Sequence, residues 1–145
     1  MNIDEIKKIL PHREPMLLIE EAYSEGEGKA VAYYTVKGDE FFLQGHFPGN
    51  PIVPGVIQCE MMAQASCVLL KDKMTGEDIL PLYTGLKNVR FKNQVKPGDR
   101  VRMDVELIES RPPFYFLKGR LSVDEKTVMQ GEFSCAIVEA QKEGN

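Results

Sequence analysis

The sequence predicts an α+β fold in which one long buried helix packs against a curved antiparallel sheet. Residues 56–74 (VIQCEMMAQASCVLLKDKM) are rich in helix formers, and they are apolar on most faces as far as Leu70, as in a buried helix. Four later segments alternate apolar and polar residues, or are rich in β-branched and aromatic residues, as strands are. One helix with about six such strands indicates a sheet that curves around the helix.

The other elements follow in chain order. Residues 3–10 carry Ile at helical spacing and should form a short helix that ends before Pro11. Tight turns are expected at 96–99 (KPGD) and 124–126 (DEK), and the tail 141–145 should fray. The predicted strands are residues 16–23, 29–37, 83–95, 100–109, 114–123 and 127–140.

Length and composition set the class of protein. With 145 residues, the chain is assigned to one domain, residues 1–145, that can bury a real core. The net charge of -4 argues against nucleic acid as the main partner. Three cysteines without metal-ligand spacing indicate free thiols in a reducing compartment. The start lacks the apolar run of a signal peptide, and no stretch suggests a membrane span, so we expect a cytoplasmic protein without membrane association.

The segment 42–66 (FLQGHFPGNPIVPGVIQCEMMAQAS) holds the candidate chemistry. His46 lies in a loop that Gly and Pro restrict, and it titrates near neutrality, so it could act as a base. Glu60 lies among apolar helix residues, where burial favours the protonated acid, a proton donor. The helix start near Gly55 offers free N–H groups that could polarise a carbonyl. These groups fit removal of a proton beside a carbonyl, coupled to loss of a β-hydroxyl.

Each residue also has a structural interpretation. His46 could be structural or merely exposed, and Glu60 could be a paired or snorkelling carboxylate. For His12, in LPHREP, the structural interpretation is favoured, because nothing acidic and apolar lies beside it in sequence. Two histidines far apart in the chain do not indicate a metal site, and no cofactor is expected.

Three segments in order along the chain resemble the (3R)-hydroxyacyl-[acyl-carrier-protein] dehydratases of bacterial fatty acid synthesis, the FabZ type. They are LPHREPMLLIE (10–20), FFLQGHFPGNPIVPGVIQCEMMAQA (41–65) and NVRFKNQVKPGDRV (88–101). The resemblance implies the hotdog fold, a long central helix wrapped by a curved antiparallel sheet. It implies His46 as the base, Glu60 as the acid, and the Gly55 amide as the group that holds the thioester carbonyl. Asn50 and Glu60 resemble the plain dehydratases, whereas the dehydratase-isomerase branch has Asp in place of Glu.

The resemblance also implies partners and a reaction. The substrate would be a (3R)-3-hydroxyacyl group on acyl carrier protein, and the product a trans-2-enoyl thioester, with no metal or redox cofactor. The assembly would be a homodimer, or a hexamer built as a trimer of dimers, in which the loop histidine of one subunit meets the helix glutamate of the other. Because carrier proteins are acidic, a basic docking surface is expected. Its candidates are Lys87, Arg90, Lys92, Lys96, Arg100 and Arg102.

Two other functions remain open on the sequence. A hotdog acyl thioesterase would hydrolyse an acyl thioester with a water-activating carboxylate, and would need no base at His46. A non-catalytic acyl-binding module would keep the fold and bind the acyl group without converting it. The contribution of residues 71–82 to an acyl tunnel cannot be assigned, because this segment varies in the family.

Overall fold

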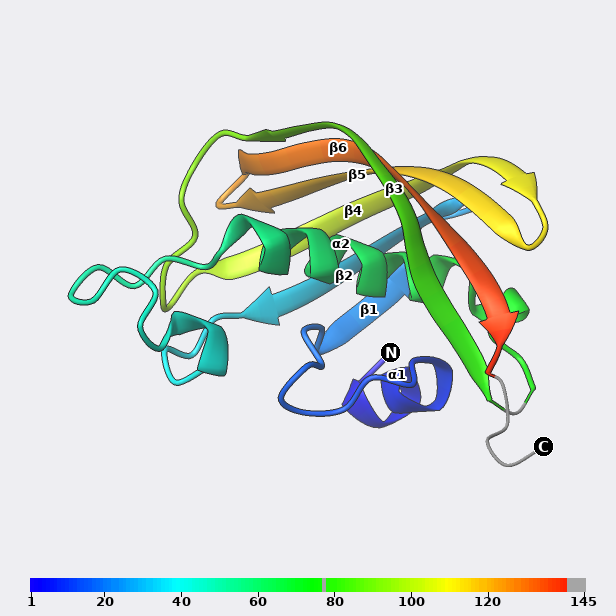
Figure 1. The fold of residues 1–145 in the computed structure, drawn as a ribbon, viewed down its shortest axis with the longest axis horizontal. Coiled ribbons are helices and arrows are strands. Elements are labelled where there is room, and N and C mark those ends of the chain that lie inside the picture. Colours follow the sequence, from blue (N-terminus) through cyan, green and yellow to red (C-terminus); the bar gives the residue numbers. More distant parts are fainter. Residues whose placement is uncertain (77, 141–145) are drawn as a thin grey trace.

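The computed structural model describes residues 1–76 and 78–140. A long helix, α2 (Gly55–Leu69), lies in the hollow of a curved six-stranded sheet, and the short helix α1 (Ile3–Ile9) lies beside its open side (Figure 1). Every neighbouring pair of strands is antiparallel, in the order β1-β2-β4-β5-β6-β3. The strands are β1 (Glu21–Ser24), β2 (Lys29–Thr35), β3 (Ile79–Phe91), β4 (Arg100–Arg111), β5 (Phe114–Val123) and β6 (Lys126–Glu139). The predicted α+β arrangement is confirmed.

The core lies between α2 and the inner face of the sheet. On the helix, Met61, Met62 and Ala65 are fully buried. Strand β4 alternates as a half-buried strand should, with Val101 and Met103 pointing inward. The sheet and helix also approach closely where the chain has glycine: a Cβ built on Gly119 would lie 2.5 Å from the Met62 sulfur. Packing of the apolar helix therefore holds the sheet in its curved shape.

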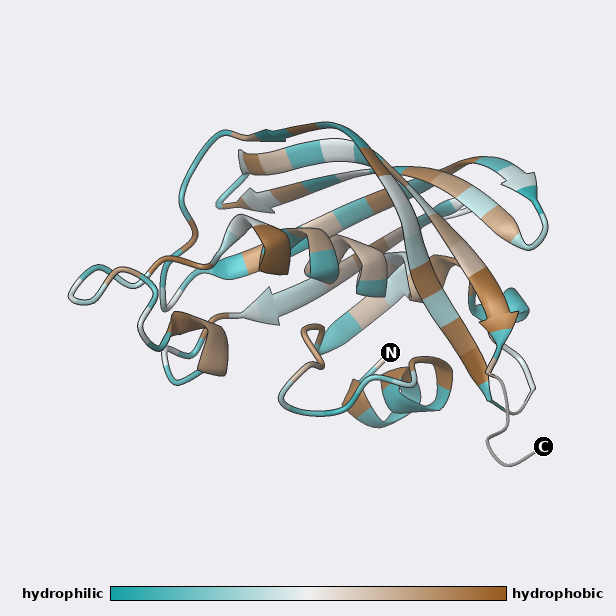
Figure 2. Cartoon of the chain, in the orientation of Figure 1, coloured by the Kyte–Doolittle hydropathy of each residue, from teal (hydrophilic) through white to brown (hydrophobic). Residues whose placement is uncertain are grey.

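Two strand boundaries differ from the predicted ones. The strand predicted at 16–23 begins only at Glu21, because the backbone on either side of Leu17 bonds instead to the amide of Gln64 on α2. The strand predicted at 83–95 is β3, shifted towards the N-terminus, because residues 79–82 pair with the end of β6. The paired ends of these two strands are largely apolar (Figure 2), which favours contact between their side chains across the pair.

The other elements lie where they were predicted, although the long helix ends early. Helix α1 is confirmed, with Asn2 and Glu5 forming a capping box at its start. The helix predicted at 56–74 ends at Leu69, and a 3-10 turn follows at Lys71–Lys73. The turn at 124–126 is confirmed, with Asp124 and Glu125 at positive φ, as a tight hairpin requires. The fraying expected at 141–145 concerns residues outside the described part of the chain.

Strand β3 is an edge strand of the sheet, and it is unusually long and apolar for that position. It spans thirteen residues, and Leu82, Leu86 and Phe91 on it are about half exposed, at 48%, 51% and 52%. Long apolar edges with free backbone groups are prone to pair with another chain.

Among the described residues, no helix is both long and apolar enough to cross a membrane.

Candidate active site

The loop that carries His46 is anchored on its N-terminal side by Glu40. This carboxylate accepts hydrogen bonds from the N–H groups of Lys37 (2.9 Å) and Gly38 (2.7 Å) and from the Tyr34 hydroxyl (2.6 Å). Burial by itself would raise the pKa of Glu40, but these hydrogen bonds lower it below its usual value. The 3-10 turn that follows, Phe41–Leu43, buries two of its side chains in the core. The loop therefore leaves the sheet from a fixed point.

We predict that Glu40→Gln lowers the free energy of unfolding at pH 7 by about 1–3 kcal/mol, because an amide accepts these hydrogen bonds less well. The folded-state pKa of Glu40 is depressed, so its stabilising contribution is present above the ordinary pKa of 4.5 and is lost as pH falls through the folded value. Urea unfolding of both proteins from pH 7 down to about pH 3 measures the difference.

The matched control for this measurement is Glu14→Gln, whose carboxylate pairs with Lys7 on the exposed surface. This substitution should leave the unfolding free energy nearly unchanged, because solvent screens an exposed ion pair. A loss at Glu40 that stays constant over the whole pH range would contradict the role given to its ionised form.

His46 has one ring nitrogen engaged and one free. Its Nδ1 lies 2.8 Å from the carbonyl oxygen of Ile52. A carbonyl can only accept, so Nδ1 must carry the proton that it donates. Nε2 has no hydrogen-bond partner within the described residues, and in this tautomer it holds a free lone pair. The imidazole also contacts the Phe47 ring in a tilted arrangement, with ring centroids 4.2 Å apart. The loop thus orients the His46 ring through Nδ1 and leaves Nε2 unengaged by the described residues.

Gly55 begins α2, and the helix start has unused N–H groups. Pro54 caps the helix without a side-chain hydrogen bond, while its carbonyl accepts from Ile57 and Gln58. The N–H groups of Gly55 and Val56 have no acceptor among the described residues. A Cβ on Gly55 would lie 2.9 Å from the Phe91 ring, so a side chain here would have to displace that ring. Glycine therefore lets β3 pack directly against the start of the helix.

Glu60 is less buried than expected from the apolar residues around it. A quarter of its side chain (24%) is exposed, and its Oε2 atom has two nitrogen neighbours. The Gln64 amide donates to it at 3.1 Å, and His12 Nε2 lies 3.4 Å away. Within the described residues, no hydrogen bond or ion pair involves Oε1. The paired interpretation of Glu60 is thus correct for one oxygen and leaves the other available.

His12 and Gln64 are the two site residues that sequence reasoning missed. The structural interpretation of His12 was based on its sequence neighbours, and it overlooked the acidic residue that folding brings beside it. Gln64 had a detectable signal, because it lies four residues after Glu60, on the same helix face. Its side chain is fully buried and also bonds to the backbone of Met16 and Leu18, so it ties the His12 segment to α2.

Glu60 borders a small cavity between α2 and the edge of the sheet. The cavity has a volume of about 50 Å³, and its other walls include Ala63, Leu82, Tyr83 and Cys135. The Tyr83 hydroxyl donates to the carbonyl of Cys59 on the helix. Within the described residues, no hydrogen bond or ion pair joins Glu60 to His46, and the contacts given above for the two side chains share no residue.

The chain has close sequence relatives among known enzymes. The sequence model of the FabA-like domain matches residues 10–132. A 3-hydroxyacyl-[acyl-carrier-protein] dehydratase FabZ from Petrotoga mobilis is 45% identical over 138 residues, which cover 94% of this chain and 98% of the relative. A protein of the same name from Clostridium perfringens is 45% identical over 137 residues, covering 94% and 99%.

Solved structures with low sequence identity share the fold. The dehydratase heterocomplex ApeI:P from Xenorhabdus doucetiae contains a chain that matches with a TM-score of 0.80 at 22% identity, covering 94% of this chain and 91% of that one. An HP0420 homologue from Helicobacter felis matches with a TM-score of 0.69 at 17% identity, covering 97% and 92%. The chain has the hotdog fold, and it belongs to the FabA-like family, in which its relatives are FabZ dehydratases.

Proposed function

We propose that this protein dehydrates (3R)-3-hydroxyacyl groups carried on acyl carrier protein to trans-2-enoyl groups, in fatty acid biosynthesis. Residues 1–145 act as one dehydratase domain, in the cytoplasm. The names of the sequence relatives support the reaction. One structural observation carries the chemistry: His46 and Glu60 each have one polar atom held by the protein and a second one free.

His46 is the base in this proposal. Its Nε2 lone pair takes the α-proton of the thioester. The electron pair of that C–H bond delocalises onto the thioester carbonyl, and it forms the α,β double bond when the β-hydroxyl leaves. The Nδ1–H bond to the Ile52 carbonyl orients the ring and stabilises the imidazolium that forms. The thioester carbonyl itself acidifies the α-proton, so the step needs no metal or redox cofactor.

Gly55 and Glu60 complete the reaction. The free Gly55 N–H at the positive end of α2 stabilises the enolate-like oxygen of the thioester. Glu60 donates a proton to the departing β-hydroxyl, directly or through water. The C–O bond breaks, the α,β double bond forms, and water leaves. Each acid or base contribution of this kind is worth on the order of 10²–10⁴-fold in rate.

Hydration of crotonyl thioester tests the proposal in the reverse direction. A dehydratase adds water to the double bond, and the ultraviolet absorbance of the conjugated enoyl thioester falls. Release of free thiol instead would identify a thioesterase. Binding of the thioester without any absorbance change would identify a non-catalytic acyl-binding module, and either result would overturn the proposal.

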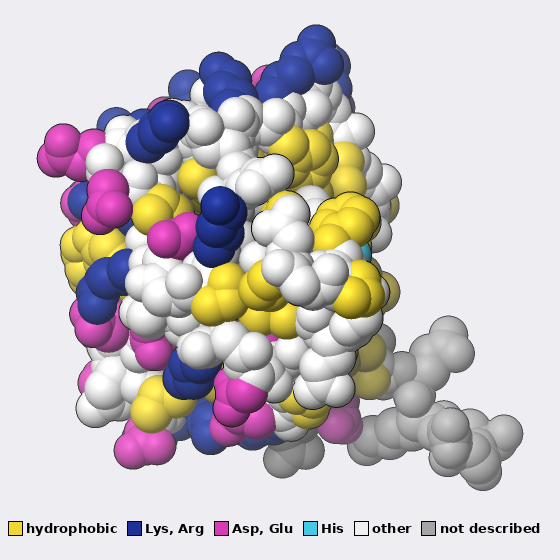
Figure 3. Space-filling view, turned by 90° about the vertical axis from the view of Figure 1, so that its left-hand side faces the viewer, with side chains coloured by type: hydrophobic (Ala, Val, Ile, Leu, Met, Phe, Trp, Pro, Cys, Tyr) yellow, Lys and Arg dark blue, Asp and Glu magenta, His cyan; other side chains and the backbone are white. Residues whose placement is uncertain are grey.

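The carrier protein would dock on basic residues near the start of α2. Figure 3 shows the left-hand side of the molecule as drawn in Figure 1, where α2 begins. On this face, Lys and Arg side chains gather along the upper rim, above apolar side chains. Lys92, Lys96 and Lys126 line one surface hollow of about 520 Å³, and they outnumber the two carboxylates that also line it, Asp99 and Asp124. None of the three forms an ion pair within the described residues. The hollow that these three lysines line, named here the lysine hollow, is the proposed docking site.

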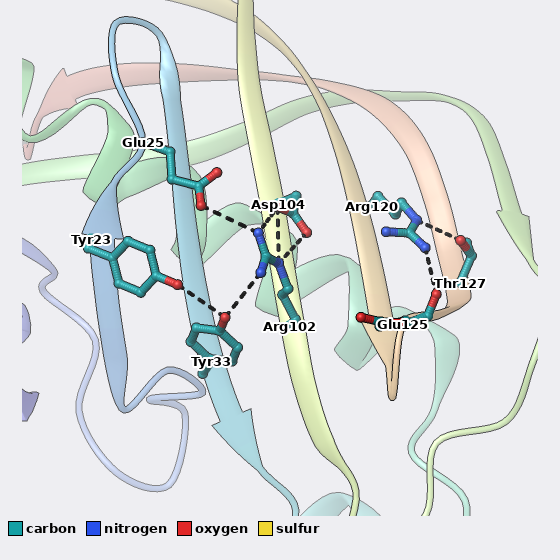
Figure 4. A network of polar contacts seen from close by, with 8 residues as sticks. All are labelled: Tyr23, Glu25, Tyr33, Arg102, Asp104, Arg120, Glu125 and Thr127. Atoms are coloured by element: carbon teal, nitrogen blue, oxygen red, sulfur yellow. Dashed lines mark hydrogen bonds and ion pairs between the residues drawn. The ribbon is translucent and has the colours of Figure 1, made fainter.

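Two of the candidates from the sequence are engaged elsewhere. Arg102 lies on the outer face of the sheet, where its guanidinium bonds to Asp104 at 3.0 Å and pairs with Glu25 at 3.5 Å (Figure 4). Arg100 pairs with Glu21 at 3.3 Å. Because their charges are balanced locally, neither residue is retained as a docking residue.

We predict that Lys92→Glu combined with Lys96→Glu raises the KM for carrier-bound substrate by about tenfold or more, because it replaces attraction to an acidic carrier by repulsion. The KM for a small acyl-CoA should change by less than about threefold. Steady-state kinetics with both substrates measure the effect. The control is Arg111→Glu, an exposed charge at the opposite end of β4. Equal changes for both substrates, or an equal effect of Arg111→Glu, would reject the lysine hollow.

The assembly is proposed to be a homodimer or a trimer of such dimers. The long apolar edge of β3 supports pairing with a second copy, because this would cover exposed Leu82 and Leu86 and satisfy free backbone groups. In such a dimer, His46 of one protomer would meet Glu60 of its partner. The absence of any contact between the two side chains within the described residues of one chain is consistent with this arrangement.

A further inference from the structure

We infer that His12 is a positioning residue for the acid, holding Glu60 Oε2 so that the catalytic proton lies on Oε1. The inference rests on the proposed role of Glu60. His12 is not one of the three residues, His46, Gly55 and Glu60, to which the proposed reaction assigns a role.

The two oxygens of Glu60 have different surroundings. Oε2 lies between the Gln64 amide nitrogen at 3.1 Å and the His12 Nε2 at 3.4 Å, whereas Oε1 has no partner within the described residues. The Gln64 amide nitrogen can only donate, so Oε2 must accept from it. A protonated carboxyl has one O–H donor and one oxygen that only accepts. With Oε2 committed to accepting, the proton is placed on Oε1, the free oxygen.

The unpaired nitrogen of His12 assigns its tautomer. Nδ1 is buried and has no hydrogen-bond partner among the described residues. A buried N–H without an acceptor costs more than a buried lone pair without a donor. The tautomer with its proton on Nε2 avoids this cost and points that proton at Glu60. The 3.4 Å separation is longer than a good N–H···O bond, and such contacts in free enzymes commonly shorten when substrate binds.

The backbone around His12 is held firmly enough for this role. The Arg13 guanidinium donates to the carbonyls of Lys7 (3.0 Å), Leu10 (2.9 Å) and His12 itself (2.7 Å), which fixes the turn after α1. Gln64 fixes the following residues to α2 through its bonds to Met16 and Leu18. His12 is therefore placed against Glu60 by contacts that do not involve its own ring.

The test compares three variants at His12 in the crotonyl thioester assay. His12→Phe keeps the ring shape and removes the donor, and His12→Leu replaces it if that variant does not fold. Either should lower kcat by about tenfold or more, with KM within about threefold of native. His12→Gln supplies an N–H donor at similar reach, and it should keep kcat within about threefold of native. A native kcat without the donor, or a loss in His12→Gln as large as in His12→Phe, would overturn the inference.

A second set of variants separates positioning from a general structural effect. In the Glu60→Gln background, His12→Phe should cause no further loss, because its action passes through the acid. A further loss by the same factor as in the native background would show that His12 acts independently of Glu60, and would overturn the inference. If Glu60→Gln alone keeps near-native kcat, the proposed acid itself is wrong. A low kcat for Glu60→Gln with a native kcat for His12→Phe would reject only the role of His12.

Discussion

His46→Ala and Glu60→Gln are each expected to lower kcat by about 10²-fold or more while the protein stays folded. The alanine variant removes the Nε2 atom that is proposed to take the α-proton. In Glu60→Gln, the amide keeps the size of the side chain but cannot give up a proton as a carboxylic acid does. Hydration of crotonyl thioester gives kcat and KM for each variant, and thermal unfolding monitors the fold.

The control for the glutamate is Glu106→Gln, a carboxylate on the outer face of the sheet that pairs with Lys118 at 3.6 Å. It should leave kcat unchanged, because that pair lies on the other side of the sheet from α2. Near-native turnover by either site variant, with the native fold retained, would show that the role given to that residue is wrong. The two variants are judged separately, since a dehydratase could lose its acid and keep its base.

Mixing the two inactive variants is expected to restore activity. In a C₂ dimer whose sites each combine His46 of one protomer with Glu60 of its partner, a mixed dimer contains one site with both lesions. The other site pairs native His46 with native Glu60. This expectation is motivated by the separate surroundings of the two side chains within one chain and by the exposed edge of β3.

Random pairing of equal amounts makes about half of the dimers mixed, and each mixed dimer has one intact site of two. Refolding or coexpressing the variants together should therefore yield about a quarter of native activity. Differently tagged chains, purified through both tags, establish that mixed dimers are present. If these dimers are no more active than the separate variants combined, each site is built within one chain and the shared-site arrangement is wrong.

The sequence pattern was sufficient to predict those helices and strands whose formation depends on residues close together in the chain. The start of the helix at Gly55 and the strands over 100–111 and 114–123 follow from helix formers and from alternating burial, and the sequence predicts them closely. The start of β1 was not predicted, because the backbone near Leu18 bonds to a side chain on α2. The shift of β3 has the same kind of cause, since pairing with β6 recruits residues 79–82.

For the candidate site too, the sequence was enough to select residues but not to predict their contacts. His46, Gly55 and Glu60 lie within one short segment, so the residue types and the family resemblance were enough to select them. The atoms that remain free on His46 and Glu60 were not predictable, because they depend on a carbonyl at Ile52 and on the Gln64 amide. The surroundings of the docking candidates were not predictable either, since charge along the sequence does not reveal that Arg100 and Arg102 face carboxylates.

The sequence by itself determined the fold class and the family and selected three candidate site residues, because each depends on periodicity or on residues close together in the chain. Only the tertiary structure decided which groups surround those residues. The placement of His12 against Glu60 depends on the turn after α1, on the guanidinium of Arg13 and on the anchoring by Gln64. Hydrogen bonds of this kind join segments that are far apart in the chain, so no local pattern records which side chain will meet the acid.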